Sequence, residues 1–161
     1  MTNKRALVIG YGNPLRGDDG LGWEVTERLA AYIPDGSVAI MAVQQLTPEL
    51  SEPIHAADLV IFVDASSEGE PGTWKCERVA PVLVHAPSFG HHFDIADLLA
   101  YTQALFPSCP GPGALVVSVA AESFGCHEKL SRKVETVLPA VVSYIGEQIA
   151  ALNTNQEPLY A

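Results

Sequence analysis

Cysteine is scarce in this 161-residue sequence, and positive charge is also sparse. The three cysteines, Cys76, Cys109 and Cys126, are odd in number, far apart and without CxxC spacing. This pattern excludes a disulfide framework and gives no support to a cysteine-based zinc site. It fits a protein of the reducing cytoplasm.

Lysine and arginine together number 9 against 19 acidic residues, so the formal net charge is −10. Nucleic-acid-binding proteins usually carry a basic stripe, and the sequence contains none. A solvated surface accounts for most of the acidity, and attraction to a basic segment of a partner is a weaker interpretation. The composition therefore argues against nucleic acid as a partner.

Long hydrophobic runs are missing as well. The apolar run at residues 6–9 ends at Gly10, which makes it too short for a signal peptide or a membrane span. We therefore expect a soluble, cytoplasmic protein with no membrane partner. Hydrophobic residues make up 48% and charged residues 17%, which suits one compact core. A single domain is predicted over residues 1–152, and residues 153–161 are predicted to fray.

Short apolar runs alternate with amphipathic segments along the chain. Buried strands are predicted at residues 6–9, 38–43, 59–63 and 115–119, with an edge strand at 73–79. Helices are predicted at residues 20–32, 48–56, 94–106 and 134–149. This alternation predicts an α/β fold with a mostly parallel sheet that is covered on both faces.

The segment between the first predicted strand and helix is rich in glycine. It begins like a dinucleotide fingerprint, but Leu15 stands where the third glycine belongs. Asp18 and Asp19 then occupy the place where a pyrophosphate would bind, and like charges repel. No Gly-Lys-Ser/Thr follows either. The sequence therefore argues against a nucleotide cofactor.

The same loop contains residues with expected structural or functional roles. Asp18 is expected to cap the helix that follows. For Asp19 two interpretations stay open, a second capping acid or a site carboxylate that faces the crevice. Gly10 and Gly12 would let the backbone turn sharply and approach a ligand, and Asn13 would hold the turn by bonding its own backbone.

Two carboxylates and a histidine are predicted to meet at the carboxyl ends of the strands. Asp19 follows the first strand, Asp64 ends the third, and His91 and His92 precede the helix at residue 94. Carboxylates with an imidazole suit nickel or zinc and leave positions open for water or substrate. The same acids could instead form a metal-free acid–base pair, and the spacing does not decide. A surface or capping role is expected for the remaining histidines, His55, His85 and His127.

Residues 9–22, IGYGNPLRGDDGLG, resemble the N-terminal signature of the hydrogenase maturation proteases. This signature is a glycine, any residue, a second glycine and an asparagine, then an acidic pair before another glycine. By this resemblance Asp19, Asp64 and His91 match the metal ligands of the family. When the downstream segment at residues 96–99 is aligned with the family, the histidine ligand of the family falls on His91 rather than on His92. The resemblance runs over most of the chain, from the first strand to the final helix.

The resemblance implies a three-layer αβα sandwich of the phosphorylase/hydrolase-like kind. It also implies an endopeptidase, of aspartic type or metal-assisted, that removes the C-terminal extension of the nickel-loaded NiFe-hydrogenase large-subunit precursor. The precursor would present the nickel, and the free enzyme would bind it weakly through Asp19, Asp64 and His91. Asp19 and Asp64 would also be catalytic. Residues 45–50 resemble the branch of the family that serves bidirectional, NAD-linked hydrogenases.

The sequence leaves two other functions open. One is a nickel-sensing chaperone of the same fold that does not cut the precursor, and the other is a metal-dependent hydrolase of small molecules. A protease releases a peptide from the precursor, whereas a chaperone only co-purifies with it. A small-molecule hydrolase would hold its metal without any protein partner. No serine lies in a Gly-x-Ser-x-Gly elbow, and no cysteine has a motif that marks it as a nucleophile.

Overall fold

The structure, a computed structural model, describes residues 4–33, 36–81, 93–107, 111–126 and 129–154. Its centre is one five-stranded sheet in the order β2-β1-β3-β5-β4. The strands are β1 Ala6–Tyr11, β2 Val38–Val43, β3 Leu59–Ser66, β4 Trp74–Arg78 and β5 Gly113–Ala120. The edge strand β4 runs antiparallel to β5, and all other pairs are parallel. The mostly parallel sheet is therefore confirmed, with each strand close to its predicted place.

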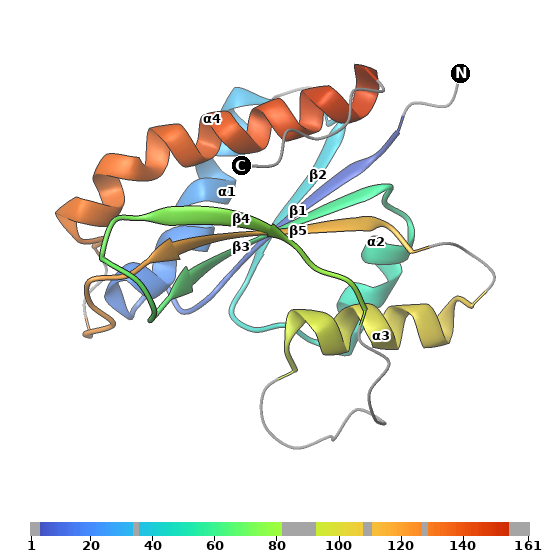
Figure 1. The fold of residues 1–161 in the computed structure, drawn as a ribbon, viewed down its shortest axis with the longest axis horizontal. Coiled ribbons are helices and arrows are strands. Elements are labelled where there is room, and N and C mark those ends of the chain that lie inside the picture. Colours follow the sequence, from blue (N-terminus) through green and yellow to red (C-terminus); the bar gives the residue numbers. More distant parts are fainter. Residues whose placement is uncertain (1–3, 34–35, 82–92, 108–110, 127–128, 155–161) are drawn as a thin grey trace.

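Helices cover both faces of this sheet, which confirms the three-layer αβα arrangement. The helices are α1 Leu21–Tyr32, α2 Ser51–His55, α3 Ile95–Leu105 and α4 Arg132–Thr154. Short 3-10 turns, η1 Gly17–Gly20 and η2 Pro48–Leu50, precede α1 and α2. In Figure 1, α1 and α4 lie above the sheet while α2 and α3 lie below it. None of the helices in the described part of the chain is both long and apolar enough to cross a membrane.

The buried side chains form two clusters, one on each face of the sheet. Successive strand residues point to opposite faces, so Val8 packs with α1 and α4 while Leu7 and Ile9 pack with α2 and α3. Phe62, in the centre of β3, is the largest of the fully buried side chains. Burial of a side chain of this size contributes about 1.5–3 kcal/mol. The strands are thus buried on both faces, as their continuous apolar runs predict.

The start of α3 is fixed by a capping box. The Asp94 carboxylate accepts a hydrogen bond from the Asp97 backbone N–H at 2.7 Å, and the Asp97 carboxylate accepts one from the Asp94 N–H at 3.4 Å. These contacts satisfy two donors that the first helical turn leaves without partners. The predicted N-cap at Asp94 is confirmed. The predicted boundary at residue 152 stays a prediction, because α4 continues to Thr154 and the rest of the tail lies outside the described residues.

Helices α2 and α3 cover only part of their face of the sheet. Their cluster contains strand residues such as Leu7, Val60 and Ala114, which lie toward the amino ends of the strands. Asp64, at the other end of β3 on the same face, is only half-buried. The carboxyl ends of the strands are therefore accessible on the α3 side of the sheet, which is where a ligand site is expected in such folds.

Candidate functional site

Close backbone packing explains two glycines in the loop after β1. A Cβ at Gly10 would lie 2.1 Å from the carbonyl oxygen of Gly22, and one at Gly12 would lie 2.1 Å from that of Asp19. Gly12 also has a φ of +137°, which side chains other than glycine rarely adopt. Both glycines thus pack against the chain's own backbone in η1 and α1, and Gly12 also lines the pocket described below, where the sequence predicts a close approach to a ligand.

Hydrogen bonds hold this loop against Asp19. The Asn13 Oδ1 accepts a hydrogen bond from the Leu15 N–H at 2.9 Å, which confirms that Asn13 holds the turn. The Asn13 N–H donates to Asp19 Oδ2 at 2.7 Å, and Trp23 Nε1–H donates to the Gly12 carbonyl at 2.8 Å. The carboxylate of Asp19 is thus attached to the loop before any ligand arrives.

The expected capping role of Asp18 is wrong. Gly20 is the N-cap of α1, and no side chain caps that end of the helix. The Asp18 carboxylate is fully buried instead, and accepts hydrogen bonds from the N–H and hydroxyl of Ser131 at 2.6 and 2.8 Å. It also accepts them from the N–H groups of Glu122 and Ser123 at 2.8 and 3.1 Å. Turn η1 directs the side chain away from the helix and toward this later segment.

These four hydrogen bonds keep Asp18 in its charged form. Burial by itself raises the pKa of a carboxyl group. In Asp18 the hydrogen bonds, with those from Ser131 contributing most, outweigh burial and lower the pKa below its usual value. Asp18 therefore joins η1 to the segment that follows β5, and it fixes the position of the neighbouring Asp19.

Asp19 and Asp64 line one pocket at the carboxyl ends of the strands. This site pocket has a volume of about 860 Å³. It is lined by Tyr11, Gly12, Asn13, Arg16, Asp19, Gln44, Gln45, Leu46, Asp64, Phe93 and Asp94. The structure thus brings two of the three predicted site residues to one pocket, and the Asp19 carboxylate accepts its hydrogen bond from Asn13 and caps neither η1 nor α1. His91 and His92 lie outside the described residues, although Phe93 and Asp94, which follow them, line the pocket.

Asp64 has a partner that the sequence did not reveal. The hydroxyl of Tyr11 donates a hydrogen bond to Asp64 Oδ2 at 2.9 Å. Burial raises the pKa of Asp64 to about 6, the charge of Asp19 adds to the rise, and the bond from Tyr11 opposes it. Burial, followed by the charge of Asp64, also raises the pKa of Tyr11. Tyr11 therefore stays protonated and remains a hydrogen-bond donor to Asp64.

The donor chemistry of the site pocket matches part of a nickel or zinc site. Asp19 and Asp64 offer carboxylate oxygens, which are suitable ligands for either metal. Among the described residues, no group of three or more His, Cys, Asp and Glu side chains is placed to hold a metal ion. A complete metal site would therefore need a further donor, from the segment that contains His91 or from a substrate.

The remaining histidines and cysteines that the structure describes lie outside the site pocket. His55 stacks on Phe106 with ring centroids 3.8 Å apart and planes 6° from parallel, which fits a structural role. His85 and His127 lie outside the described residues. Cys76 and Cys126 are free thiols, so neither contributes to a disulfide framework.

Comparison with solved structures shows a close likeness to hydrogenase maturation proteases. The hydrogenase maturating endopeptidase HybD from E. coli is 27% identical, with a TM-score of 0.74 and a match over 93% of either chain. An endopeptidase from Escherichia coli, solved in solution, is 27% identical, with a TM-score of 0.72 over 95% of either chain.

A third likeness concerns the fold alone. The NiFe-hydrogenase maturation protease HycI from Thermococcus kodakarensis is 24% identical, with a TM-score of 0.71 over 90% of this chain and 92% of that one. The sequence matches no protein-family model, and no curated protein is significantly similar to it. At 27% identity, the structural neighbours named above are thus a hydrogenase maturating endopeptidase and a further endopeptidase.

Proposed function

We propose that this protein is an endopeptidase that removes the C-terminal extension of a nickel-loaded NiFe-hydrogenase large-subunit precursor. The observation that carries the proposal is the site pocket, in which Asp19 and Asp64 face one space at the carboxyl ends of the strands. The likeness to E. coli HybD over nearly the whole chain supports the same activity. The likeness of residues 45–50 to the NAD-linked branch favours a bidirectional hydrogenase as the partner, in the cytoplasm.

Two carboxylates in one pocket suit the hydrolysis of a peptide bond. A carboxylate would take a proton from a water molecule while the water oxygen attacks the scissile carbonyl carbon. The C–N bond then breaks, and the proton passes to the leaving amine. Asp64 suits the role of base because the hydrogen bond from Tyr11 holds its carboxylate in place. Asp19, attached to the N–H of Asn13, would position the substrate or the water.

Nickel belongs to the substrate in this proposal, and Asp19, Asp64 and His91 would contact it while the precursor supplies the remaining ligands. Bound nickel would identify a loaded precursor, and as a Lewis acid it would polarise a coordinated carbonyl group. With two carboxylates among three protein ligands, the free enzyme should bind nickel weakly. In calorimetric titrations, we expect affinity to rise when the precursor is present and protons to be released on binding.

A processing assay tests the function and the site together. The wild type and the variants Asp19→Asn, Asp64→Asn and His91→Ala are incubated with nickel-loaded and with nickel-free precursor. The mass of the large subunit then reports cleavage. We expect the wild type to cleave only the loaded precursor and the three variants to remain folded but inactive. His92→Ala is the matched control and should retain most of the activity.

Each alternative gives a different result in this assay. Cleavage of nickel-free precursor at an undiminished rate would remove nickel recognition from the proposal. Full activity of Asp19→Asn would show that the assigned site is wrong. Binding of the precursor with no change in its mass would indicate a chaperone instead of a protease. Tight nickel binding without any precursor would favour a hydrolase of small molecules.

A further inference from the structure

A second hollow lies next to the site pocket, toward the β4 edge of the sheet. This edge hollow has a volume of about 250 Å³. It is lined by Ser66, Glu68, Gly69, Thr73, Trp74, Lys75, Ser118 and Ala120. None of these residues lines the site pocket, and none has a role in the activity proposed above.

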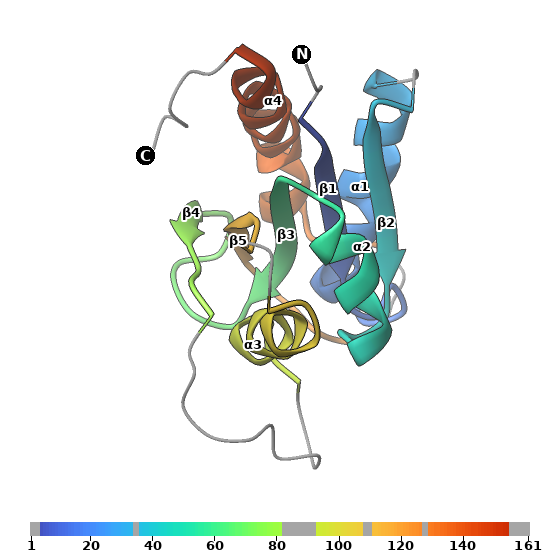
Figure 2. The ribbon, with the colours of Figure 1, turned by 90° about the vertical axis from the view of Figure 1, so that its right-hand side faces the viewer.

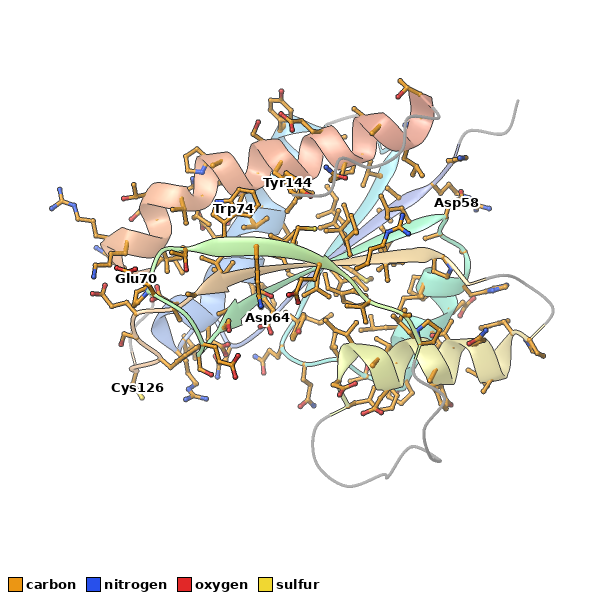
Figure 3. All side chains as sticks on the ribbon, viewed as in Figure 1. Asp58, Asp64, Glu70, Trp74, Cys126 and Tyr144 are labelled. Carbon is orange, nitrogen blue, oxygen red and sulfur yellow. The ribbon has the colours of Figure 1, made fainter. Side chains whose placement is uncertain are left out.

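Strand register places the edge hollow beside Asp64. Asp64 of β3 is paired with Ser118 of β5, and Ser118 is paired with Lys75 of β4. Residues paired in this way point to the same face of a sheet. Trp74, the neighbour of Lys75, points to the other face and contacts Tyr144 of α4 with ring centroids 5.2 Å apart. Figure 3 shows Trp74 next to α4 and Asp64 on the opposite side of the sheet, toward α3.

The distance across the row of paired residues Asp64, Ser118 and Lys75 suits a short stretch of extended peptide. Neighbouring strands lie about 4.8 Å apart, so the row from β3 to β4 spans roughly 10 Å. An extended peptide advances about 3.3 Å per residue, so roughly three residues would cover the row. A chain bound at Asp64 would thus reach the exposed edge of the sheet within a few residues.

The edge hollow offers hydroxyl groups that can bind a peptide backbone. The half-buried Ser118 hydroxyl has no hydrogen-bond partner within the part of the chain that the structure describes. The hydroxyl of Ser66 accepts a bond from the Glu68 N–H at 3.1 Å, so its proton is still available to a ligand. The hydroxyl of Thr73 donates to the Glu70 carbonyl at 2.6 Å and can still accept a bond.

Charges around the edge hollow are nearly balanced. Lys75 pairs with Glu77, with Nζ 3.2 Å from Oε1, and Glu68 lines the hollow on another side. Neither a strongly basic nor a strongly acidic ligand gains much from this arrangement. The hollow therefore suits a polar or neutral peptide segment, which it would bind through the backbone.

We propose that the edge hollow binds the first residues of the C-terminal extension that the enzyme removes. This inference rests on the proposed function and assigns a place to the leaving part of the substrate. The edge hollow, at about 250 Å³, is smaller than the site pocket, at about 860 Å³, and it lies at the β4 edge, so it suits a short tail. Gln44 and Gln45, which are exposed and follow β2, line the site pocket from the opposite edge of the sheet from β4, where the body of the large subunit would remain. Figure 2 shows β2 and β4 at opposite edges of the sheet.

Ser118→Leu tests this assignment because the larger side chain fills the hollow and removes a hydroxyl that has no partner among the described residues. Two nickel-loaded precursors are compared, one with the complete extension and one with the extension shortened to a single residue. We expect Ser118→Leu to lower kcat/KM roughly tenfold on the complete precursor, the size of effect expected for one lost hydrogen bond and a blocked subsite. For the wild type, kcat/KM should be lower on the shortened precursor than on the complete one by a similar factor. On the shortened precursor, Ser118→Leu should lower kcat/KM by less than a further factor of about two, because the contact between the extension and the edge hollow is already lost.

Control variants separate a subsite from a general disturbance. Thr136→Leu makes a similar change on the exposed face of α4, on the other side of the sheet, and should leave both rates unchanged. Ser118→Thr keeps the hydroxyl and should retain most of the activity. Thermal unfolding checks each fold, and Ser118→Val, with a side chain suited to a strand, replaces Ser118→Leu if that variant unfolds.

The outcomes distinguish this inference from the proposed function. Equal losses on the complete and the shortened precursor would overturn the inference, because the variant would then act through Asp64 rather than through the extension. Wild-type kcat/KM in a folded Ser118→Leu variant would also overturn it, while the proteolytic function would stand. Failure of the wild type to cleave either precursor would instead refute the proposed function itself.

Discussion

Replacing Asp64 by asparagine should stabilise the metal-free protein at pH 7.5 while it abolishes cleavage. Burial and the charge of Asp19 raise the pKa of Asp64 from 3.8 to about 6. Between these two pH values the native state binds more protons than the unfolded chain, so stability falls as pH rises. The introduced amide carries no charge at any of these pH values, and its oxygen could still accept the hydrogen bond from Tyr11.

The size of the gain in stability from Asp64→Asn follows from the raised pKa of Asp64. Each unit of pKa corresponds to about 1.4 kcal/mol, so a pKa of about 6 corresponds to a cost of up to about 3 kcal/mol for the charged carboxylate above pH 7. In a protein of this length, 1 kcal/mol shifts the Tm by roughly 2–4 °C. Asp64→Asn should therefore raise the Tm by up to roughly 6–12 °C at pH 7.5. At pH 4, where Asp64 is mostly protonated in the native state, the gain should nearly vanish.

Thermal unfolding in the presence of a chelator measures this effect across pH 4 to 8. Removing the charge of Asp19 should lower the pKa of Asp64, so the gain should be smaller when Asp64→Asn is made in an Asp19→Asn background. A gain of equal size at pH 4 and pH 7.5 would refute the argument from charge burial. A lower Tm at pH 7.5 would show that contacts other than the hydrogen bond from Tyr11 stabilise the carboxylate of Asp64.

Three further predictions concern the groups around the site. Asp18→Ala should lower the free energy of unfolding by about 3–5 kcal/mol in urea titrations, because it leaves buried donors without a partner. Since the pKa of Asp18 is lowered in the native state, this loss should shrink as the pH falls below 4. Tyr11→Phe should raise the pKa of Asp64 further, so the acidic limb of the pH profile of kcat/KM should move to higher pH. An unmoved limb would contradict the coupling between Tyr11 and Asp64. Gly12→Ala should lower both the Tm and the activity, because its Cβ would meet the Asp19 carbonyl; an unchanged Tm would count against the close packing described here.

Local patterns in the sequence determine most of the secondary structure. The apolar runs and helical periodicities place the described strands and helices within about five residues of their observed bounds, because side-chain direction repeats every two residues in a strand and every 3.6 in a helix. The capping box at Asp94 and Asp97 is equally local, since its partners are three residues apart. Asp64 is recognisable as a site candidate because an acid near the carboxyl end of a buried strand faces the crevice of a parallel sheet.

Only the tertiary structure decides which distant groups share a site. The carboxylate of Asp18 looks like a helix cap, but its donors lie more than 100 residues further along the chain. The pairing of Tyr11 with Asp64 spans 53 residues, and the edge hollow depends on the register between β3, β5 and β4. Sequence periodicity tells which face a side chain occupies, whereas its neighbours on that face depend on strand order. The raised pKa of Asp64 is therefore a property of the assembled sheet, because burial and the nearby charge of Asp19 arise only when β1 and β3 lie side by side.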